Sequence, residues 1–303
     1  MRLRTDLVSG QVGANLGAFL AAILLGASVV AVRAAVKDIP PLDLAVLRFG
    51  QGAAILLLVL AIGARERLRV ARRDIPFLAL LGAIFFSAFP LTFNTALKFT
   101  EASRGAVVIA TLPVWSIILG RLLAGERLHT RQTLGVLLTV AGVALAIGTA
   151  STQAGKDALL GDALMLVTAF LGALYGVLAK RALKSYSALT VTTYSMGIGT
   201  ILLLPAALPG GLTGAGSSVR LVLFLGVLGG ALAFSLWTSA LSHLSPTSVA
   251  VYINVNPMVA ALLGILLLSE RVEPIFFAGF VAVVCGVYLV NVVPSNRGTR
   301  SRQ

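Results

Sequence analysis

Residues 110–127, ATLPVWSIILGRLLAGER, and residues 254–271, NVNPMVAALLGILLLSER, are two versions of one apolar pattern. A shift of 144 positions places Pro113 on Pro257 and superimposes the Glu-Arg pairs that end both stretches. The match extends without a gap over the whole of residues 81–145 and includes four glycines. Unrelated apolar sequences share many Leu and Val but seldom a proline, a Glu-Arg pair and four glycines in one register. We therefore infer an internal duplication.

The composition excludes an ordinary soluble globule. Of 303 residues, 58% are apolar and 12% are charged, and the mean hydropathy is +0.97, whereas a soluble domain carries about 25% charged residues. The 31 Gly and 11 Pro, together with the apolar content, exclude a disordered chain and a coiled coil. The net charge of +13 does not indicate a nucleic-acid partner, because the positive charges lie between apolar runs. We expect an all-α membrane protein.

Ten apolar runs recur along the chain. A helix that crosses about 30 Å of hydrocarbon needs about 20 mostly apolar residues, and no loop between the runs is long enough to hold a separate domain. The sequence thus predicts ten transmembrane helices, at residues 14–32, 42–63, 76–97, 103–124, 132–149, 159–179, 188–208, 218–241, 246–268 and 274–293.

The distribution of Lys and Arg predicts the orientation, because these residues stay mainly on the cytoplasmic side of short loops. Of the 24 Lys and Arg residues, sixteen lie at the termini or in loops after even-numbered spans, and Arg48 lies within a span. Both termini are therefore expected in the cytoplasm, with the protein in the cell inner (plasma) membrane. Only seven cations lie in loops after odd-numbered spans: Arg33, Lys37, Lys98, Arg104, Lys156, Arg220 and Arg271.

The duplication divides the chain into two units of five spans each, residues 14–149 and 159–293. Because five is odd, the second unit enters the membrane from the opposite side, which gives two inverted five-helix repeats. Inverted repeats can exchange conformations, so that a site between them opens first to one side and then to the other. This geometry favours an alternating-access transporter; the alternative is a duplication retained only for stability.

Two long stretches resemble the two copies of the EamA repeat in the drug/metabolite transporter superfamily. They are LLGAIFFSAFPLTFNTALKFTEASRGAVVIATLPVWSIILGRLLAGERL at 80–128 and LWTSALSHLSPTSVAVYINVNPMVAALLGILLLSERV at 236–272. Segments 24–50 and 161–183 resemble the opening helices of each copy, so the resemblance covers about residues 15–293. It implies ten helices, internal termini and export of small metabolites, commonly amino acids or related compounds.

The ninth span carries polar groups at the depth where a transport site needs them. Tyr252 and Asn256 lie four residues apart and share a helical face, with Asn254 between them. An asparagine in lipid leaves donors and acceptors unpaired, at a cost of several kcal/mol. These side chains are therefore expected to contact substrate or, alternatively, to form hydrogen bonds that hold helices together.

Prolines near the middle of spans are candidate hinges. Pro113, Pro257 and Pro90 each lack the amide hydrogen that a helix needs, which frees a carbonyl one turn earlier. Such a break can serve as a hinge or offer carbonyls to a ligand. A static kink that only shapes helix packing is the alternative.

Aromatic side chains could stack on a substrate or close a gate, although Trp and Tyr also anchor helices at the membrane interface. Trp237 is the strongest candidate because it lies well inside the eighth span, and Phe93 is its equivalent in the first repeat. The remaining candidates for substrate contact are the aromatic residues Trp115, Tyr175 and Tyr194 and the polar residues Asn94, Thr111, Ser195 and Thr238.

Arg48 is the one cation placed within a predicted span. It could extend its guanidinium to the interface. The functional alternatives are that it attracts a substrate carboxylate from within a cavity, or that it pairs with Asp43 to hold a gate.

The eleven Asp and Glu residues all fall at predicted span ends or in loops. Proton-driven export usually needs an ionisable group at depth, so we predict downhill export without carboxylate-based proton coupling. One Cys and two His provide neither a disulfide framework nor a metal cluster, and no catalytic constellation is evident. We expect no cofactor, no metal and no enzymatic activity.

The leading hypothesis is an exporter of small neutral or zwitterionic metabolites, with amino acids as the first candidates. The runner-up is an exporter of cationic or aromatic drugs, for which an apolar cavity offers aromatic faces. The expected partners are a small-molecule substrate and the lipid bilayer, with no nucleic acid, and a monomer is the simplest assembly.

Overall fold

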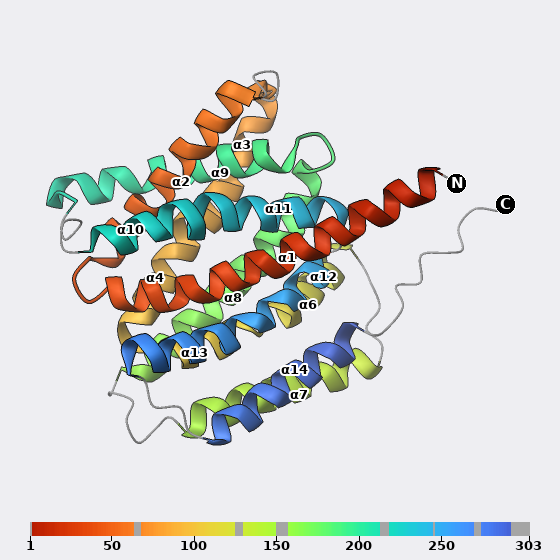
Figure 1. Ribbon diagram of the computed structural model, residues 1–303, viewed down its shortest axis with the longest axis vertical. Helices are drawn as coiled ribbons and strands as arrows, with labels where there is room; N and C mark the ends of the chain where they lie inside the picture. Colours follow the sequence, from red (N-terminus) through yellow and green to blue (C-terminus); the bar gives the residue numbers. More distant parts are fainter. Residues whose placement is uncertain are drawn as a thin grey trace.

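The computed structural model describes residues 2–63, 68–124, 130–149, 157–212, 218–244, 246–269 and 274–291, and every regular element in these ranges is helical (Figure 1). The first half of the chain contains α1 (Arg2–Ala35), α2 (Pro41–Gly63), η2 (Arg72–Asp74), α3 (Ile75–Gly82), η3 (Ala83–Ala88), α4 (Phe89–Phe99), α5 (Ala102–Ile109), α6 (Leu112–Ala124) and α7 (Thr130–Thr149). The second half contains α8 (Ala158–Ala182), α9 (Ala188–Ala207), η5 (Leu208–Gly210), α10 (Val219–Gly226), η6 (Val227–Leu232), α11 (Ala233–His243), α12 (Pro246–Val251), η7 (Tyr252–Asn254), α13 (Val255–Leu268) and α14 (Pro274–Asn291). The Glu-Arg pairs at 126–127 and 270–271 lie outside the described residues.

Seven helical stretches in the described ranges are long and apolar enough to cross a membrane. Two shorter apolar helices, Tyr252–Leu268 and Pro274–Gly286, follow them. The chain is therefore a multi-pass helical membrane protein, and the count of ten crossings stays a prediction. The seven are Val12–Ala35, Pro41–Gly63, Arg72–Phe99, Ala102–Leu123, Ala158–Ala182, Ala188–Ala207 and Val219–His243.

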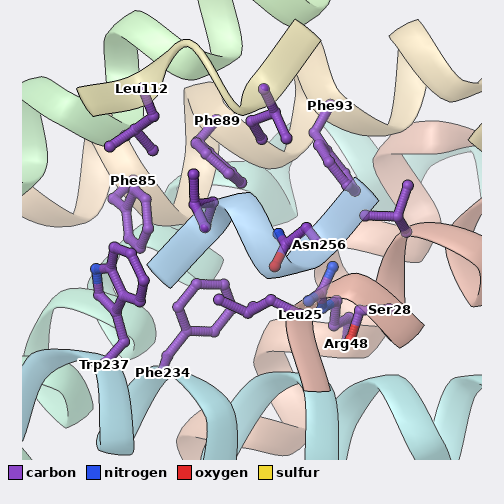
Figure 2. A pocket seen from close by; sticks show the side chains of 14 residues that line it. Leu25, Ser28, Arg48, Phe85, Phe89, Phe93, Leu112, Phe234, Trp237 and Asn256 are labelled. Atoms are coloured by element: carbon purple, nitrogen blue, oxygen red, sulfur yellow. The ribbon is translucent and has the colours of Figure 1, made fainter. Parts of the chain in front are cut away.

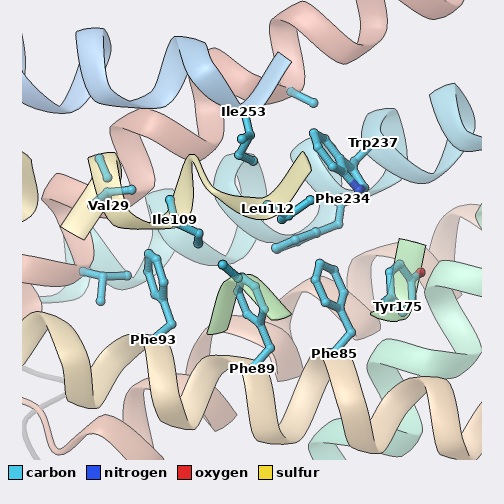
Figure 3. Packing of buried hydrophobic residues seen from close by; sticks show 14 of the residues in the cluster. Val29, Phe85, Phe89, Phe93, Ile109, Leu112, Tyr175, Phe234, Trp237 and Ile253 are labelled. Carbon is cyan, nitrogen blue, oxygen red and sulfur yellow. The ribbon is translucent and has the colours of Figure 1, made fainter. Parts of the chain in front are cut away.

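The outer surface of the bundle is apolar, as a lipid environment requires. Ile62 is 80% exposed and Leu266 is 67% exposed, and many other Leu and Val side chains also face outward. Soluble proteins seldom expose contiguous apolar surface on this scale. The core is also apolar, and its centre is a group of aromatic rings from η3, α4, α8 and α11 (Figure 3).

Local sequence explains where several helices begin and end. Pro41 opens α2, where its missing amide hydrogen costs no helical hydrogen bond, and Gly63 is its last residue. Ser187 precedes α9, and its Oγ accepts the Thr190 amide hydrogen bond at 3.2 Å. This side chain caps the amino terminus of the helix.

The two halves contain the same interruption at equivalent positions. The segments η3 and η6 are π-helical turns, at residues 83–88 and 227–232, and the offset between them is the 144 positions that align the sequence. In each half an eight-residue helix precedes the π turn and an eleven-residue helix follows it. A π turn re-aims the side chains that follow it, so the duplication extends to the local geometry.

The helix partners exchange between the halves. In Figure 1, α1 lies between α11 and α13, and α8 packs correspondingly against α4 and α6. The helix α2 packs against its counterpart α9, and α7 packs against its counterpart α14 along one edge of the bundle. The same equivalent helices therefore meet in both directions across the two halves.

Single contacts also recur in both halves. Arg33 on α1 donates from Nη1 to the carbonyl of Leu97, at 2.7 Å, at the carboxyl end of α4. Lys180 on α8 donates from Nζ to the carbonyl of Leu241, at 2.5 Å, at the carboxyl end of α11. Leu241 follows Leu97 by the same 144 positions. Each cation caps the negative end of a helix in its own half.

The helices α7 and α14 cross at glycines. A Cβ at Gly142 would lie 2.7 Å from the carbonyl oxygen of Gly279, and a Cβ at Gly286 would lie 2.5 Å from that of Gly135. The order of these contacts makes the two helices antiparallel. Only residues without a side chain permit backbones to approach so closely, so these glycines set the distance between α7 and α14.

Candidate functional site

A pocket lies between the first and second halves of the chain (Figure 2). Its interior and mouth leave about 500 Å³ free of protein atoms. Aromatic residues form most of the wall: Phe85, Phe89, Phe93, Phe234 and Trp237. Aliphatic residues and one glycine complete the apolar part: Leu25, Val29, Ile109, Leu112, Gly172 and Ile253. The polar lining residues are Ser28, Arg48 and Asn256, and among the described residues that line the pocket there is no Asp or Glu.

Three phenylalanines form a continuous aromatic wall. Phe85, Phe89 and Phe93 are spaced four residues apart, and their rings point to the same side in Figure 3. The ring centroids of Phe85 and Phe89 lie 4.7 Å apart, and those of Phe89 and Phe93 lie 5.8 Å apart. Tyr175 on α8 stacks on Phe85 at 4.1 Å and supports the wall from behind. Such ring pairs hold one another in place.

Arg48 brings a positive charge into this apolar pocket. Arg48 is 2% exposed, and its Nη2 donates to the carbonyl of Gly229 at 2.9 Å. The guanidinium carbon lies 4.9 Å from the ring centroid of Phe49 and 5.6 Å from that of Phe234. Its Nε has no hydrogen-bond partner, and the two ion pairs seen among the described residues, Arg73–Asp74 and Arg104–Asp162, do not involve it. A buried cation without an opposite charge is costly, so the pocket favours an anionic group.

Asn256 supplies a polar group of a different kind. The residue is 2% exposed, and its Oδ1 has no hydrogen-bond partner. An unsatisfied buried acceptor costs about 1–3 kcal/mol. A bound donor would remove this cost.

Two helices are interrupted beside the pocket at equivalent points. Residues 110–111 separate α5 from α6, and η7 separates α12 from α13. Pro113 and Pro257 follow these interruptions and cannot donate to the carbonyls of Ile109 and Ile253. Both isoleucines line the pocket. The third candidate hinge, Pro90, is the second residue of α4, directly after the π turn η3.

The structure brings together four of the predicted contact residues, since Arg48, Phe93, Trp237 and Asn256 all line the pocket. Two more lie directly behind the wall: the Oη of Tyr175 and the Oγ1 of Thr238 are 3.4 Å apart. Their contact with substrate is untested and stays a prediction.

The other predicted contact residues lie away from the pocket lining. Asn94 donates to the carbonyl of Pro41 at 2.9 Å, and Thr111 donates to the carbonyl of Val108 at 2.8 Å. Tyr194 donates to the carbonyl of Leu68 at 2.6 Å, Tyr252 donates to Oδ1 of Asn15 at 2.8 Å, and Trp115 packs edge-on against Phe170. Ser195 and Asn254 each contain a buried oxygen without a hydrogen-bond partner.

Sequence reasoning missed Phe85 and Phe89. Their spacing of four residues from Phe93 was a usable signal, because it predicts one shared helical face. Sequence reasoning also placed Arg104 and Asp162 in loops or at span ends, whereas both residues are only 4% exposed in the structure. Arg104 lies in α5 and Asp162 in α8, and each charge is buried because the other neutralises it.

One tyrosine outside the apolar helices ties two turns together. Tyr186, between α8 and α9, donates from Oη to the carboxylate of Asp74 and accepts the amide hydrogen bond of Ala71 at 3.2 Å. The hydrogen bond to the Asp74 carboxylate raises the pKa of the Tyr186 phenol above its ordinary value, because it favours the protonated form. The turn before α3 and the turn before α9 therefore lie at the same end of the bundle.

The apolar bundle, its internal duplication and its enclosed pocket together define a membrane transporter. The family model of the EamA-like transporter family matches residues 13–148 and 159–292, so the chain belongs to this family. The resemblance of the two repeated stretches to the EamA repeat is thereby confirmed.

Related proteins from other organisms are described as transporters as well. An uncharacterized transporter of Archaeoglobus fulgidus is 32% identical over 279 residues, which cover 89% of this chain and 94% of the relative. A probable terminal-alkyne amino-acid exporter of Streptantibioticus cattleyicolor is 29% identical over 242 residues, which cover 78% of this chain and 80% of the relative. A solved structure described as a crystal structure of protein has a TM-score of 0.71 at 19% identity and covers 94% of this chain and 99% of its own. That likeness concerns the fold.

Proposed function

We propose that this transporter exports small neutral or zwitterionic metabolites, amino acids first among them, across the inner membrane by alternating access. The observation that carries the proposal is the pocket between the halves, which combines aromatic walls with one unpaired cation and one unpaired amide oxygen. The similarity to a probable amino-acid exporter supports the same substrate class.

The proposed membrane plan is ten crossings in two inverted five-helix repeats, at residues 14–149 and 159–293. Three observations support it: the common register of η3 and η6, the exchange of helix partners between halves, and the antiparallel crossing of α7 and α14. Inverted repeats that meet at a central pocket are a recurring plan of secondary transporters. The substrate would enter from the cytoplasm and leave when the pocket opens outward.

Contacts between turns support the proposed order of the crossings. The turn before α3 contacts the turn before α9 through Tyr186 and Ala71, and the plan places both turns in the cytoplasm. Ser218 donates to Asp38 at 3.4 Å, which joins the turn after α1 to the start of α10, and the plan places both outside. Turns that touch must share a side of the membrane, and the ten-span plan meets this condition in both cases.

Labelling of single cysteines tests the orientation. In a Cys285→Ser background, we expect an impermeant maleimide to label Asp38→Cys but not Ser185→Cys in intact cells, and both after permeabilisation. Both positions are exposed in turns. Labelling of Ser185→Cys from outside would contradict cytoplasmic termini.

The pocket lining supports export without carboxylate-based proton coupling, because its described residues include no acid that could carry the proton. The same lining disfavours cationic drugs. Aromatic faces attract cations, but the unpaired charge of Arg48 repels them from the same space.

Flux in proteoliposomes tests the function. Vesicles that contain purified protein and are loaded with a panel of labelled amino acids should release a subset of them faster than vesicles without protein do. Leu266→Ala serves as the folded control and should match wild type, since this side chain faces outward. Release of organic cations alone, with no neutral or zwitterionic solute moved, would overturn the proposal.

A further inference from the structure

We propose that the pocket recognises both charged groups of an α-amino acid that carries a large apolar or aromatic side chain. Arg48 binds the carboxylate, and Oδ1 of Asn256 with the freed carbonyls at the two helix breaks accepts the ammonium group. This inference rests on the proposed transport function and names the substrate class of the same site.

The carboxylate end follows from the contacts of Arg48. One guanidinium nitrogen is held by the carbonyl of Gly229, and two rings flank the planar group, so its orientation is fixed before a ligand arrives. Its Nε remains without an acceptor. A carboxylate supplies both the missing negative charge and the missing acceptor, in the planar geometry that guanidinium groups bind best.

The ammonium end follows from acceptors that lack donors. Oδ1 of Asn256 is buried and unpartnered, and Pro257 beside it leaves the carbonyl of Ile253 without its helical donor. Pro113 does the same for the carbonyl of Ile109. An ammonium group carries three donors and no acceptor. It therefore matches a set made only of acceptors.

Neither charged group alone satisfies the pocket. An amine without a carboxylate would meet the unpaired positive charge of Arg48. A carboxylic acid without an ammonium group would leave Oδ1 of Asn256 without a donor, and a site built to bond a polar group rejects analogues that lack it. The zwitterion satisfies both ends and adds no net charge to the pocket.

The aromatic wall defines the third part of the ligand. Figure 2 shows Trp237 and Phe85 on one side of the pocket and Arg48 and Ser28 on the other, with Asn256 between them in this view. A ligand with its charged groups at Arg48 and Asn256 would direct its side chain toward these rings. Stacked or edge-on ring contacts favour an aromatic or large apolar group there.

Competition assays with three related molecules test this reading. Proteoliposomes exchange labelled L-phenylalanine, and the competitors are unlabelled L-phenylalanine, phenethylamine, which lacks the carboxylate, and 3-phenylpropionate, which lacks the ammonium group. We expect phenylalanine to compete about 10- to 100-fold more strongly than either analogue, which is the usual effect of losing a charge-assisted hydrogen bond. L-Alanine should compete more weakly than phenylalanine.

Two variants assign the ends. Arg48→Gln should weaken competition by phenylalanine and bring that of phenethylamine to within about threefold of it. The reason is that the charge that attracts the carboxylate and repels the amine is gone. Asn256→Leu should weaken competition by phenylalanine and leave competition by 3-phenylpropionate unchanged. Leucine already occupies the equivalent position of the first repeat, Leu112, so the fold accepts it there. Arg48→Lys keeps the charge and replaces Arg48→Gln if the latter does not fold; it should raise the KM for phenylalanine.

The outcomes separate the two proposals. If folded wild-type protein moves amino acids but binds phenylalanine and both analogues equally, the recognition of the zwitterion is wrong and the transport function stands. If it moves no amino acid, the proposed function fails. Equal selectivity in wild type, Arg48→Gln and Asn256→Leu would also overturn the assignment of the two ends.

Discussion

Arg104 on α5 and Asp162 on α8 form a buried ion pair that joins the two halves of the chain. Nε of Arg104 lies 3.0 Å from each carboxylate oxygen of Asp162, and Nη2 contacts Oδ2 as well. Thr100 adds a hydrogen bond to Oδ1 at 3.3 Å. The two residues are each 4% exposed.

Removal of one partner should therefore destabilise the protein strongly. Asp162→Asn leaves the Arg104 charge buried and unbalanced, and the expected loss is about 3–5 kcal/mol. Thermal unfolding in detergent measures it. The double variant Arg104→Met/Asp162→Leu removes both charges and should recover most of the loss. A single variant as stable as wild type would show that the pair is not buried in the membrane protein.

Alanine at Gly229 should impair substrate binding through Arg48. Its Cβ would lie 2.3 Å from Oγ of Ser28 and 3.5 Å from Nη2 of Arg48. We expect Gly229→Ala to raise the KM for L-phenylalanine about tenfold, because overpacking at this point displaces the guanidinium. Ser28→Ala removes the obstructing oxygen, so the double variant should return to within about threefold of wild type. A double variant no better than Gly229→Ala would contradict this account.

Glycine replacements should separate α7 from α14. In Gly142→Ala and Gly286→Ala the new methyl group meets backbone atoms of the facing helix at 2.5–2.7 Å. Each variant should lose about 1–3 kcal/mol of stability, as overpacked sites do. Gly120→Ala is the matched control, because a Cβ there meets no atom within 4 Å. Equal melting temperatures for all three variants would mean that the helices do not pack through these glycines.

Tyr186 should titrate above the ordinary range of tyrosine. Its protonated phenol is hydrogen-bonded to Asp74 in the folded state, so its folded pKa is raised. The stabilising contribution is present below about pH 10, the pKa of an unfolded tyrosine, and is lost as the pH rises through the folded value. Phenolate absorbance measures the titration, and the difference between wild type and Tyr186→Phe isolates this residue. Asp74→Asn should lower its pKa; an unchanged titration would exclude the contact in solution.

Helix limits could be predicted from the sequence because prolines, glycines and capping residues set them locally. The predicted spans at 42–63 and 188–208 agree to within one residue with α2 and α9. The π turns could not be predicted, since no local residue pattern specifies the extra residue within an apolar run. Their equivalence in the two halves appears only when sequence and structure are aligned together.

The pocket was predicted less completely than the helices. Residue type and depth were enough to select Trp237, Asn256 and Arg48, but the rotation of each helix decides which side chains face inward. Asn94 and Tyr194, chosen by the same criteria, instead hold neighbouring segments by hydrogen bonds to carbonyls. The burial of Arg104 and Asp162 depends on contact between helices far apart in sequence, and no single stretch encodes that contact.

Leu112 and Asn256 occupy equivalent positions of the repeat, yet one is apolar and the other polar. A pocket centred on a two-fold axis and lined by identical halves would offer a ligand two equivalent binding poses, related by a rotation of 180°. The carboxylate end of an amino acid differs from its ammonium end, so the two poses would make different contacts. Divergence at this pair of positions removes the equivalence, so that one of the two poses becomes the better one in a scaffold built from two like parts.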